Sequence, residues 1–310
     1  MKIIYMGTPD FAVPCLERLV SDDDFQVVCV VTQPDKPKGR KQELTPSDVK
    51  IAALKAGLTV YQPASLKNDE ACEYLKSFNA DYIVVAAYGK ILPKSILDLP
   101  KYACVNVHGS LLPKYRGAAP IQRSVLAGDK ITGVTTMLMA EGLDTGDILL
   151  TREYSIGENE TSGQVFDALA QLSPDLLIET LHKYANGEII PKKQNDEAAS
   201  YASMITKSEA VIDWNRDMAE IHNLVRGISP WPVAYTEYKG KKLKIYSTEK
   251  TDEKTSLAPG TLKADKNEML VSCGDGLLLK ITSLGLEGSK RMDAKSFLLG
   301  HPADKDFILG

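Results

Sequence analysis

The run Tyr82-Ile-Val-Val-Ala-Ala87 decides the fold class of this 310-residue chain. Its residues are apolar without alternation, as in a strand that is buried on both faces of a parallel sheet. Amphipathic stretches separate it from further short, apolar or β-branched runs at Lys2–Met6, Gln26–Thr32, Ala103–Val107 and Thr132–Met139. Strands that alternate with helices predict an α/β domain with a mostly parallel sheet and helices on both faces.

The stretches between these runs carry helix signals. Helices are predicted at Asp10–Val20, at Pro46–Ala56 behind a Thr45 cap, and at Asp69–Phe78. A longer helix is predicted at Gly163–Ala185, where leucines recur at helical spacing and indicate core packing without a functional role.

Polar residues stand at the end of the fourth strand run. Asn106 and His108 are two positions apart, so a strand would present both side chains on one face, at the edge where such sheets bind ligands. The next apolar run leads to Asp144 in a Gly-rich turn. An amide donor, an imidazole and a carboxylate suit acyl transfer to an amine, because Asn106 could hold an oxyanion while the other two move protons.

The spacing alone leaves a structural interpretation open. Asn and Asp also serve turns, and a single His is more often structural than catalytic. Asp147 is a rival to Asp144, and we expect it to brace the turn. Cys104 shares the face of Asn106 but has no neighbouring base in the sequence, so a buried thiol is expected there.

Other enzyme classes lack their motifs. The turn Gly7-Thr-Pro-Asp-Phe-Ala12 has no second or third glycine for a dinucleotide, and the chain has no P-loop. Five cysteines without a Cys-x-x-Cys pair argue against both a disulfide framework and a zinc site.

A longer pattern surrounds the polar residues. Ser110-Leu-Leu-Pro113 and Arg116-Gly117 follow His108, and the later turn reads Leu143-Asp-Thr-Gly-Asp147. With this pattern the chain resembles the folate-dependent formyltransferases. Gln33-Pro-Asp-Lys-Pro-Lys-Gly-Arg40 and Gly117-Ala-Ala-Pro-Ile-Gln-Arg123 resemble the branch of that family that acts on a charged transfer RNA. The match runs from Met1 to about Ile281.

The resemblance implies formyl transfer from 10-formyltetrahydrofolate to the α-amino group of methionine on initiator transfer RNA, without a metal. It assigns catalysis to Asn106, His108 and Asp144. It assigns folate binding to Ser110, Leu111, Leu112, Pro113, Ala87, Tyr88, Gly89, Glu141 and Leu143. The role of Arg116 stays open between a ligand contact and a structural ion pair.

Transfer RNA contacts are expected at local basic patches, because the net charge of −4 repels nucleic acid at long range. The candidates are Lys36, Lys38, Arg40 and Lys41 in a long loop, together with the run Lys239–Lys244 and with Lys290 and Arg291. In the resembled family the loop enters the acceptor stem. This chain has Gln42-Glu43 where relatives often continue with lysines, which weakens the expected contact.

The length and the 44% apolar content predict two domains. We expect a catalytic domain at residues 1–188 with a Rossmann-like, mostly parallel sheet, a polar linker at 189–205, and a smaller β domain at 206–310. Strand-like runs are predicted at Ala234–Tyr238, Lys242–Tyr246, Met269–Ser272 and Gly276–Leu284. The resemblance implies that this second domain is an oligonucleotide-binding-like (OB-like) barrel that binds transfer RNA.

No apolar run approaches the roughly 20 residues of a membrane span, and no signal peptide is indicated, so a cytoplasmic monomer is expected. Two alternatives remain. One is a small-molecule formyltransferase or formyltetrahydrofolate hydrolase with the same three residues. The other is a noncatalytic RNA-binding protein on the same scaffold.

Overall fold

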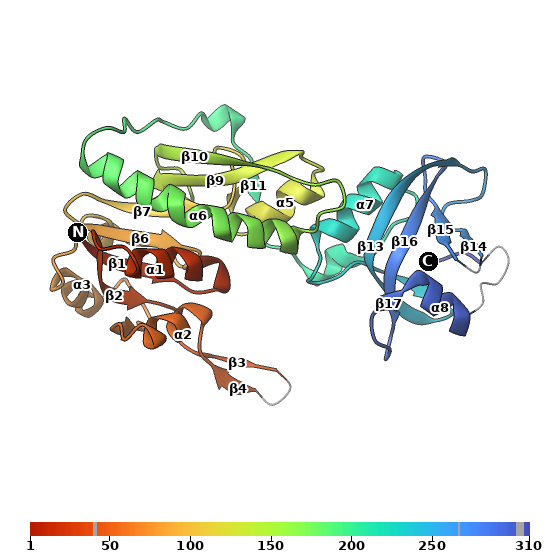
Figure 1. The fold of residues 1–310 in the computed structure, drawn as a ribbon, viewed down its shortest axis with the longest axis horizontal. Coiled ribbons are helices and arrows are strands. Elements are labelled where there is room, and N and C mark those ends of the chain that lie inside the picture. Colours follow the sequence, from red (N-terminus) through yellow and green to blue (C-terminus); the bar gives the residue numbers. More distant parts are fainter. Residues whose placement is uncertain (40–41, 266, 302–306) are drawn as a thin grey trace. The chain divides into compact units, whose positions relative to one another are not determined.

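The computed structural model describes residues 1–39, 42–265, 267–301 and 307–310 (Figure 1). The chain divides into two compact units, and it passes between them more than once. The first consists of Met1–Pro120, Thr132–Tyr154 and Phe166–Ala202, and the second of Ile121–Ile131, Ser155–Val165 and Ser203–Gly310.

A seven-stranded sheet forms the centre of the first unit. Its strand order is β10 (Ile148–Ser155), β9 (Ile131–Leu138), β7 (Ala103–His108), β6 (Tyr82–Ala86), β1 (Lys2–Gly7), β2 (Gln26–Val31) and β5 (Val60–Tyr61). The strands from β7 to β5 are parallel, whereas β9 runs antiparallel to β7. The Rossmann-like, mostly parallel sheet predicted from the apolar runs is thus confirmed.

Neighbouring residues in each strand point to opposite faces of the sheet, and helices pack on both faces. On one face Ile4, Ile83 and Val85 form a core with α3 (Asp69–Lys76) and α4 (Lys94–Leu97). α6 (Ser162–Ala185) joins the sheet through a hydrogen bond of 3.0 Å from the Tyr82 hydroxyl to the Leu181 carbonyl.

The helix boundaries refine the predictions. The first helix begins as a 3₁₀ turn, η1 (Asp10–Ala12), and continues as α1 (Val13–Val20). The prediction of a Thr45 cap was wrong. α2 spans Asp48–Lys55, and its cap is Ser47, whose hydroxyl accepts from the Lys50 amide because Ser47 still has an extended backbone.

The basic loop is more regular than expected. It contains a short antiparallel pair of strands, β3 (Lys36–Lys38) and β4 (Glu43–Thr45), with Pro37 opposite Leu44. Lys36 is exposed. The candidates Arg40 and Lys41 lie outside the described residues, as does the side chain of Lys38.

The expected linker contains structure of its own. The 3₁₀ turn η2 (Asp196–Ala198) is followed by β11 (Tyr201–Ala202), which pairs in parallel with β8 (Arg116–Gly117). This part of the expected linker therefore belongs to the first unit, where it lies against the segment that follows β7.

The second unit is built on a curved antiparallel sheet. Its path is β12 (Tyr235–Tyr238), β13 (Lys241–Lys254), β16 (Leu277–Leu286), β15 (Met269–Ser272) and β14 (Leu262–Ala264), and β17 (Met292–Asp293) pairs with β16. Its other elements are α5 (Pro120–Leu126), most of which lies in this unit, η3 (Lys207–Ala210), α7 (Met218–Gly227) and α8 (Ala294–Gly300). The expectation of a smaller, mostly antiparallel β domain is confirmed as a curled half-barrel (Figure 1).

None of the helices in the described ranges is both long enough and apolar enough to cross a membrane.

Candidate functional site

The candidate site lies at the carboxyl end of β7. The side chains of Asn106 and His108 are almost completely buried there, with exposed fractions of 8% and 6%. Asn106 lies between Val85 of β6 and Met137 of β9 in the sheet register. The side-chain amide of Asn106 makes no hydrogen bond to any residue that the structure describes, so its N–H donors are available to a bound carbonyl oxygen.

Both ring nitrogens of His108 face oxygen atoms. Nε2 lies 2.9 Å from the carbonyl oxygen of Tyr115, and Nδ1 lies 3.7 Å from Oδ2 of Asp144. A carbonyl oxygen only accepts, so Nε2 carries a proton in this arrangement. A proton on Nδ1 would then point toward the carboxylate.

Asp144 is held in a strained turn. Its φ is +51°, a left-handed conformation that Asp tolerates better than most residues. Its Oδ2 also accepts a hydrogen bond of 2.8 Å from the Gly117 amide. A Cβ at Gly146 would stand 1.8 Å from the Leu138 carbonyl oxygen, so the turn passes directly over the end of β9. Only glycine fits there.

The approach of Asp144 to His108 is not a simple consequence of strand order. β9 is antiparallel to β7, with Thr135 opposite His108, and the Met139 amide bonds to the Cys104 carbonyl. β9 thus ends at Leu138 opposite Val105, which is three residues before His108 in β7. The turn and the two side chains have to bridge an offset of about 10 Å, or three residues of strand.

A network of polar contacts supports this turn. The Gln194 amide donates to the carbonyl oxygens of Asp144 and Gly146, at 2.8 and 2.7 Å. Its oxygen accepts from Nε of Arg116 at 3.0 Å, and the Arg116 guanidinium pairs with Asp196 at 2.7 Å. Arg116 is 2% exposed. Of the two roles left open for Arg116, these contacts favour the structural ion pair.

The segment from Gln194 to Ala202 also fixes the chain next to His108. The Tyr115 amide donates to the Ser200 hydroxyl at 2.9 Å, and the Arg116 amide donates to the Ser200 carbonyl at 2.8 Å. Sequence reasoning missed Tyr115 and Gln194, and it noted Gly117 only as part of the motif. Tyr115 and Gly117 act through backbone atoms, and Gln194 lies in a polar stretch with no distinguishing pattern.

The residues expected to bind folate lie on three segments. The Ser110 hydroxyl donates to the Lys114 carbonyl at 2.7 Å, and the Leu112 amide donates to the Thr135 hydroxyl at 3.1 Å. Ser110 and Leu112 are buried, whereas Leu111 and Pro113 are partly exposed. Residues 110–113 thus form a tight turn that hydrogen bonds to β9. The partly exposed residues of this turn, Leu111 and Pro113, follow directly after His108 in the chain.

The other two folate segments expose their backbone or side chains. Ala87 and Gly89 both have positive φ and are exposed, while Tyr88 is buried between them. Glu141 and Leu143 are exposed in the turn before Asp144, with Leu143 at 54%. Exposed peptide groups next to an apolar side chain fit a flat heterocycle that carries hydrogen-bonding edges, as a pterin does.

A shallow pocket of about 240 Å³ lies at the carboxyl ends of β1 and β2. Its polar lining includes Thr8, Gln33 and Lys36. Thr8 and Gln33 both donate to the Tyr88 carbonyl, at 3.0 and 2.8 Å, which connects this pocket to the exposed segment after β6. β1 and β6 are the strands between which the chain order reverses, the usual place for a ligand in such sheets.

Cys104, on the same strand as Asn106, is a buried thiol and not a nucleophile. It is 4% exposed, and burial raises the pKa of its thiol to about 12. The expectation of an inert, buried thiol is confirmed. Within the described ranges, one group with the spacing of metal ligands is Asp22, Asp24 and His182, but the Asp22 carboxylate already binds Arg18 at 2.7 Å.

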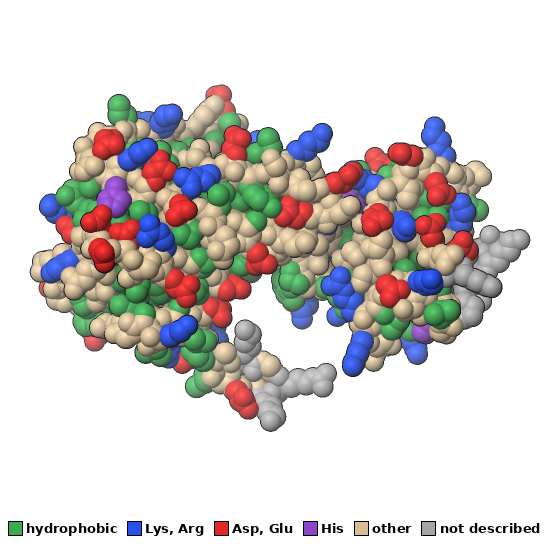
Figure 2. Space-filling view, in the orientation of Figure 1, with side chains coloured by type: hydrophobic (Ala, Val, Ile, Leu, Met, Phe, Trp, Pro, Cys, Tyr) green, Lys and Arg blue, Asp and Glu red, His purple; other side chains and the backbone are tan. Residues whose placement is uncertain are grey.

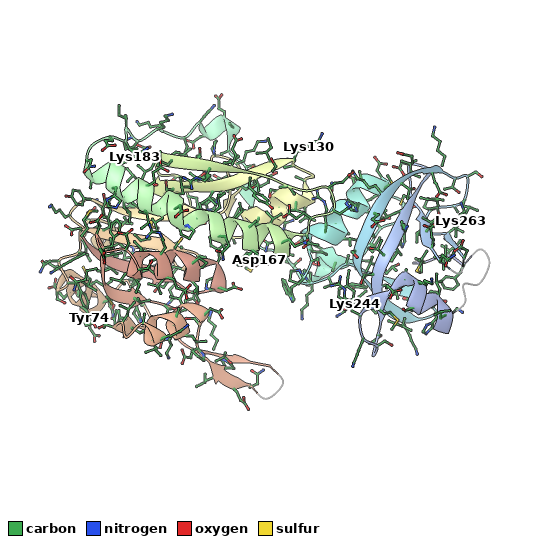
Figure 3. The ribbon with its side chains drawn as sticks, in the orientation of Figure 1. Tyr74, Lys130, Asp167, Lys183, Lys244 and Lys263 are labelled. Carbon is green, nitrogen blue, oxygen red and sulfur yellow. The ribbon has the colours of Figure 1, made fainter. Side chains whose placement is uncertain are left out.

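The basic candidates of the second unit lie on its surface. Lys290 and Arg291 are exposed, and the Arg291 guanidinium lies over the Tyr246 ring at 4.9 Å. Lys244, labelled in Figure 3, is exposed on β13. On the face seen in Figure 2, acidic and basic side chains are mixed on both units. On this face, a nucleic-acid contact would thus depend on local groups of cations instead of a single broad field.

Comparison with known proteins defines the class of this chain. A family model described as formyl transferase matches residues 1–181, and a model of the C-terminal domain of formyl transferases matches residues 204–302. The chain belongs to the formyl transferase family.

Relatives that match over their full length carry a more particular name. The chain is 49% identical, over 310 residues and 100% of both chains, to the methionyl-tRNA formyltransferase of Caldanaerobacter subterraneus subsp. tengcongensis. It is 47% identical, over 311 residues and 100% of both chains, to the methionyl-tRNA formyltransferase of Clostridium novyi.

Solved structures share the fold. An N-formyltransferase from Helicobacter canadensis, in complex with folinic acid and dTDP-3-aminofucose, superposes with a TM-score of 0.69 at 21% identity, covering 91% of this chain and 98% of that one. HypX from Aquifex aeolicus, in complex with tetrahydrofolic acid, has a TM-score of 0.62 at 16% identity, covering 100% of this chain and 50% of its own length.

Proposed function

We propose that this chain transfers the formyl group of 10-formyltetrahydrofolate to the α-amino group of methionine on initiator transfer RNA, giving N-formylmethionyl-tRNA for translation initiation. The full-length relatives at 47–49% identity, all named methionyl-tRNA formyltransferase, support this substrate. The observation that carries the chemistry is the convergence of Asn106, His108 and Asp144 at the end of β7.

The folate supplies an activated formyl group on a nitrogen. In the proposed reaction the methionine nitrogen attacks the formyl carbon, and the carbonyl oxygen becomes an oxyanion to which the Asn106 amide donates. The nitrogen–carbon bond to folate then breaks. The proton lost by the attacking amine passes through His108 to the folate nitrogen, so that the enzyme ends unchanged. Asp144 stabilises the imidazolium that forms between these steps.

His108 has to release one partner to exchange protons. Nε2 is bound to the Tyr115 carbonyl and Nδ1 faces Asp144. We propose that substrate binding displaces the Tyr115 carbonyl from Nε2, because losing the carboxylate instead would remove the charge that stabilises the imidazolium. Ser110–Pro113, Ala87–Gly89, Glu141 and Leu143 are proposed to hold the folate.

Transfer RNA is proposed to contact the hairpin of β3 and β4, through Lys36, Lys38, Arg40 and Lys41, and the second unit through Lys290 and Arg291. The exposure of Lys36, Lys290 and Arg291 supports this assignment. The domain division at residues 188 and 206 remains part of the same proposal, with transfer RNA binding assigned to residues 206–310. We further propose that the enzyme acts as a monomer in the cytoplasm, where charged transfer RNA is available.

The test is a formyl-transfer assay with the folate donor present and absent. Charged initiator transfer RNA, glycinamide ribonucleotide and water are compared as acceptors, with product formation measured for each. Transfer to the charged RNA alone is expected. Preferred transfer to the ribonucleotide or to water would replace the proposal with a small-molecule formyltransferase or a hydrolase. Failure to bind folate would instead favour the alternative of a noncatalytic RNA-binding protein on the same scaffold.

A further inference from the structure

Gln194 lies in the first unit, in the irregular stretch that follows α6. It is partly buried, and its side chain is the centre of the contacts that hold the Asp144 turn. Arg116 orients it by donating to its oxygen, which directs the two amide hydrogens toward the turn. Both N–H donors of the Gln194 side chain, and its oxygen, thus have partners in this arrangement.

The turn needs such support because its backbone is unfavourable by itself. Asp144 has a left-handed φ of +51°, and Gly146 is pressed against the Leu138 carbonyl. Residues held in sparsely populated conformations persist only where the surroundings fix them. The two hydrogen bonds from Gln194 attach to the carbonyls on either side of Thr145, and so they fix the peptide path that aims the Asp144 carboxylate.

The same stretch supports the other partner of His108. Ser200 receives the amide hydrogen of Tyr115, whose carbonyl oxygen binds Nε2 of His108. Both oxygens that surround the imidazole are therefore positioned by residues 194–200.

We propose that Gln194 is a positioning residue for Asp144, and that the segment of residues 194–200, within the first unit, positions both oxygen atoms that face the His108 imidazole. In this proposal Gln194 acts only through the turn that carries Asp144. The inference about turnover rests on the proposed formyl transfer, whereas the inference about His108 depends only on the structure.

The experiment is a double-mutant cycle between Gln194 and Asp144 in the full-length protein. Gln194→Ala is expected to lower kcat about tenfold, the scale set by two lost hydrogen bonds, with the KM for folate almost unchanged. In an Asp144→Asn background the same change is expected to have no further effect. An equal loss in both backgrounds, or an unchanged kcat in the first, overturns the proposal.

Two further variants separate positioning from misfolding. Gln194→Glu keeps the size and the contact with Arg116 but removes both donors, so it should lose as much activity as Gln194→Ala. Glu197→Gln, an exposed neighbour in η2, is the matched control and should retain full activity. Full activity in Gln194→Glu would contradict the positioning role.

A spectroscopic readout separates this inference from the proposed function. The ¹⁵N shifts of the His108 imidazole, assigned with His108→Gln, should change in Gln194→Ala and stay unchanged in Glu197→Gln. Unchanged shifts in Gln194→Ala refute the inference, whatever substrate the enzyme uses. If the wild-type protein formylates no charged transfer RNA while these shifts change, the proposed function fails and the positioning role stands.

Discussion

Replacement of Asp144 by Asn tests the electrostatic part of the mechanism most directly. The change removes one negative charge and keeps the shape of the side chain, and the remaining amide oxygen can still accept from the Gly117 amide. The carboxylate lies 3.7 Å from Nδ1 of His108. At that distance, with an effective dielectric constant of about 20, attraction to an imidazolium is worth about 4 kcal/mol.

Solvent reduces this value. The Asp144 side chain is 15% exposed, so we take roughly 3 kcal/mol as the part that the transition state gains from the charge. Since 1.4 kcal/mol corresponds to a factor of about ten, kcat should fall about a hundredfold. The folate KM and the midpoint of thermal unfolding should change little, because the fold loses no contact.

The assay is steady-state formyl transfer to charged initiator transfer RNA, with donor and acceptor varied separately. Asp147→Asn is the matched control, because Asp147 is the second acid of the same turn and should lose less than threefold, within the range of a surface change. Near-normal turnover by Asp144→Asn would refute the role of the charge. A larger loss in Asp147→Asn would show that the wrong carboxylate was assigned.

Three other predictions address the transfer RNA, the turn and the second unit. Arg40→Ala should raise the KM for transfer RNA and spare folate binding, measured by varying each substrate; equal losses of both would contradict a loop contact. Gly146→Ala should destabilise the protein by about 1–3 kcal/mol in thermal or denaturant unfolding, because its Cβ would overlap the Leu138 carbonyl, whereas Gly157→Ala meets only ordinary contacts and should not. Burial lowers the pKa of His222 below its usual 6.5, so its contribution to stability is present above about pH 6.5 and is lost as the pH falls. Unfolding midpoints of His222→Gln should therefore depend less on pH between 7.5 and 5.5 than those of the wild type, and an identical slope would rule out this group as the cause.

The sequence alone determined the elements and the nature of the chemistry. Continuous apolar runs such as Tyr82–Ala87 predict strands buried on both faces, and α6 lies within one residue of its predicted bounds. The spacing of apolar residues along the chain contains this information, because residues on one face recur every second position in a strand and about every 3.6 positions in a helix. Asn106 and His108 could be placed on one face for the same reason.

The tertiary structure alone decided how the site is assembled. β9 runs antiparallel, so a strained turn has to bring Asp144 back to His108. The groups that hold this arrangement are the backbone of Tyr115 and Gly117 and the amide of Gln194, which is 50 residues from Asp144 in the chain. Backbone groups are the same in every residue, and a contact between residues far apart in the chain produces no local periodicity. The sequence pattern therefore does not predict which groups hold the site together.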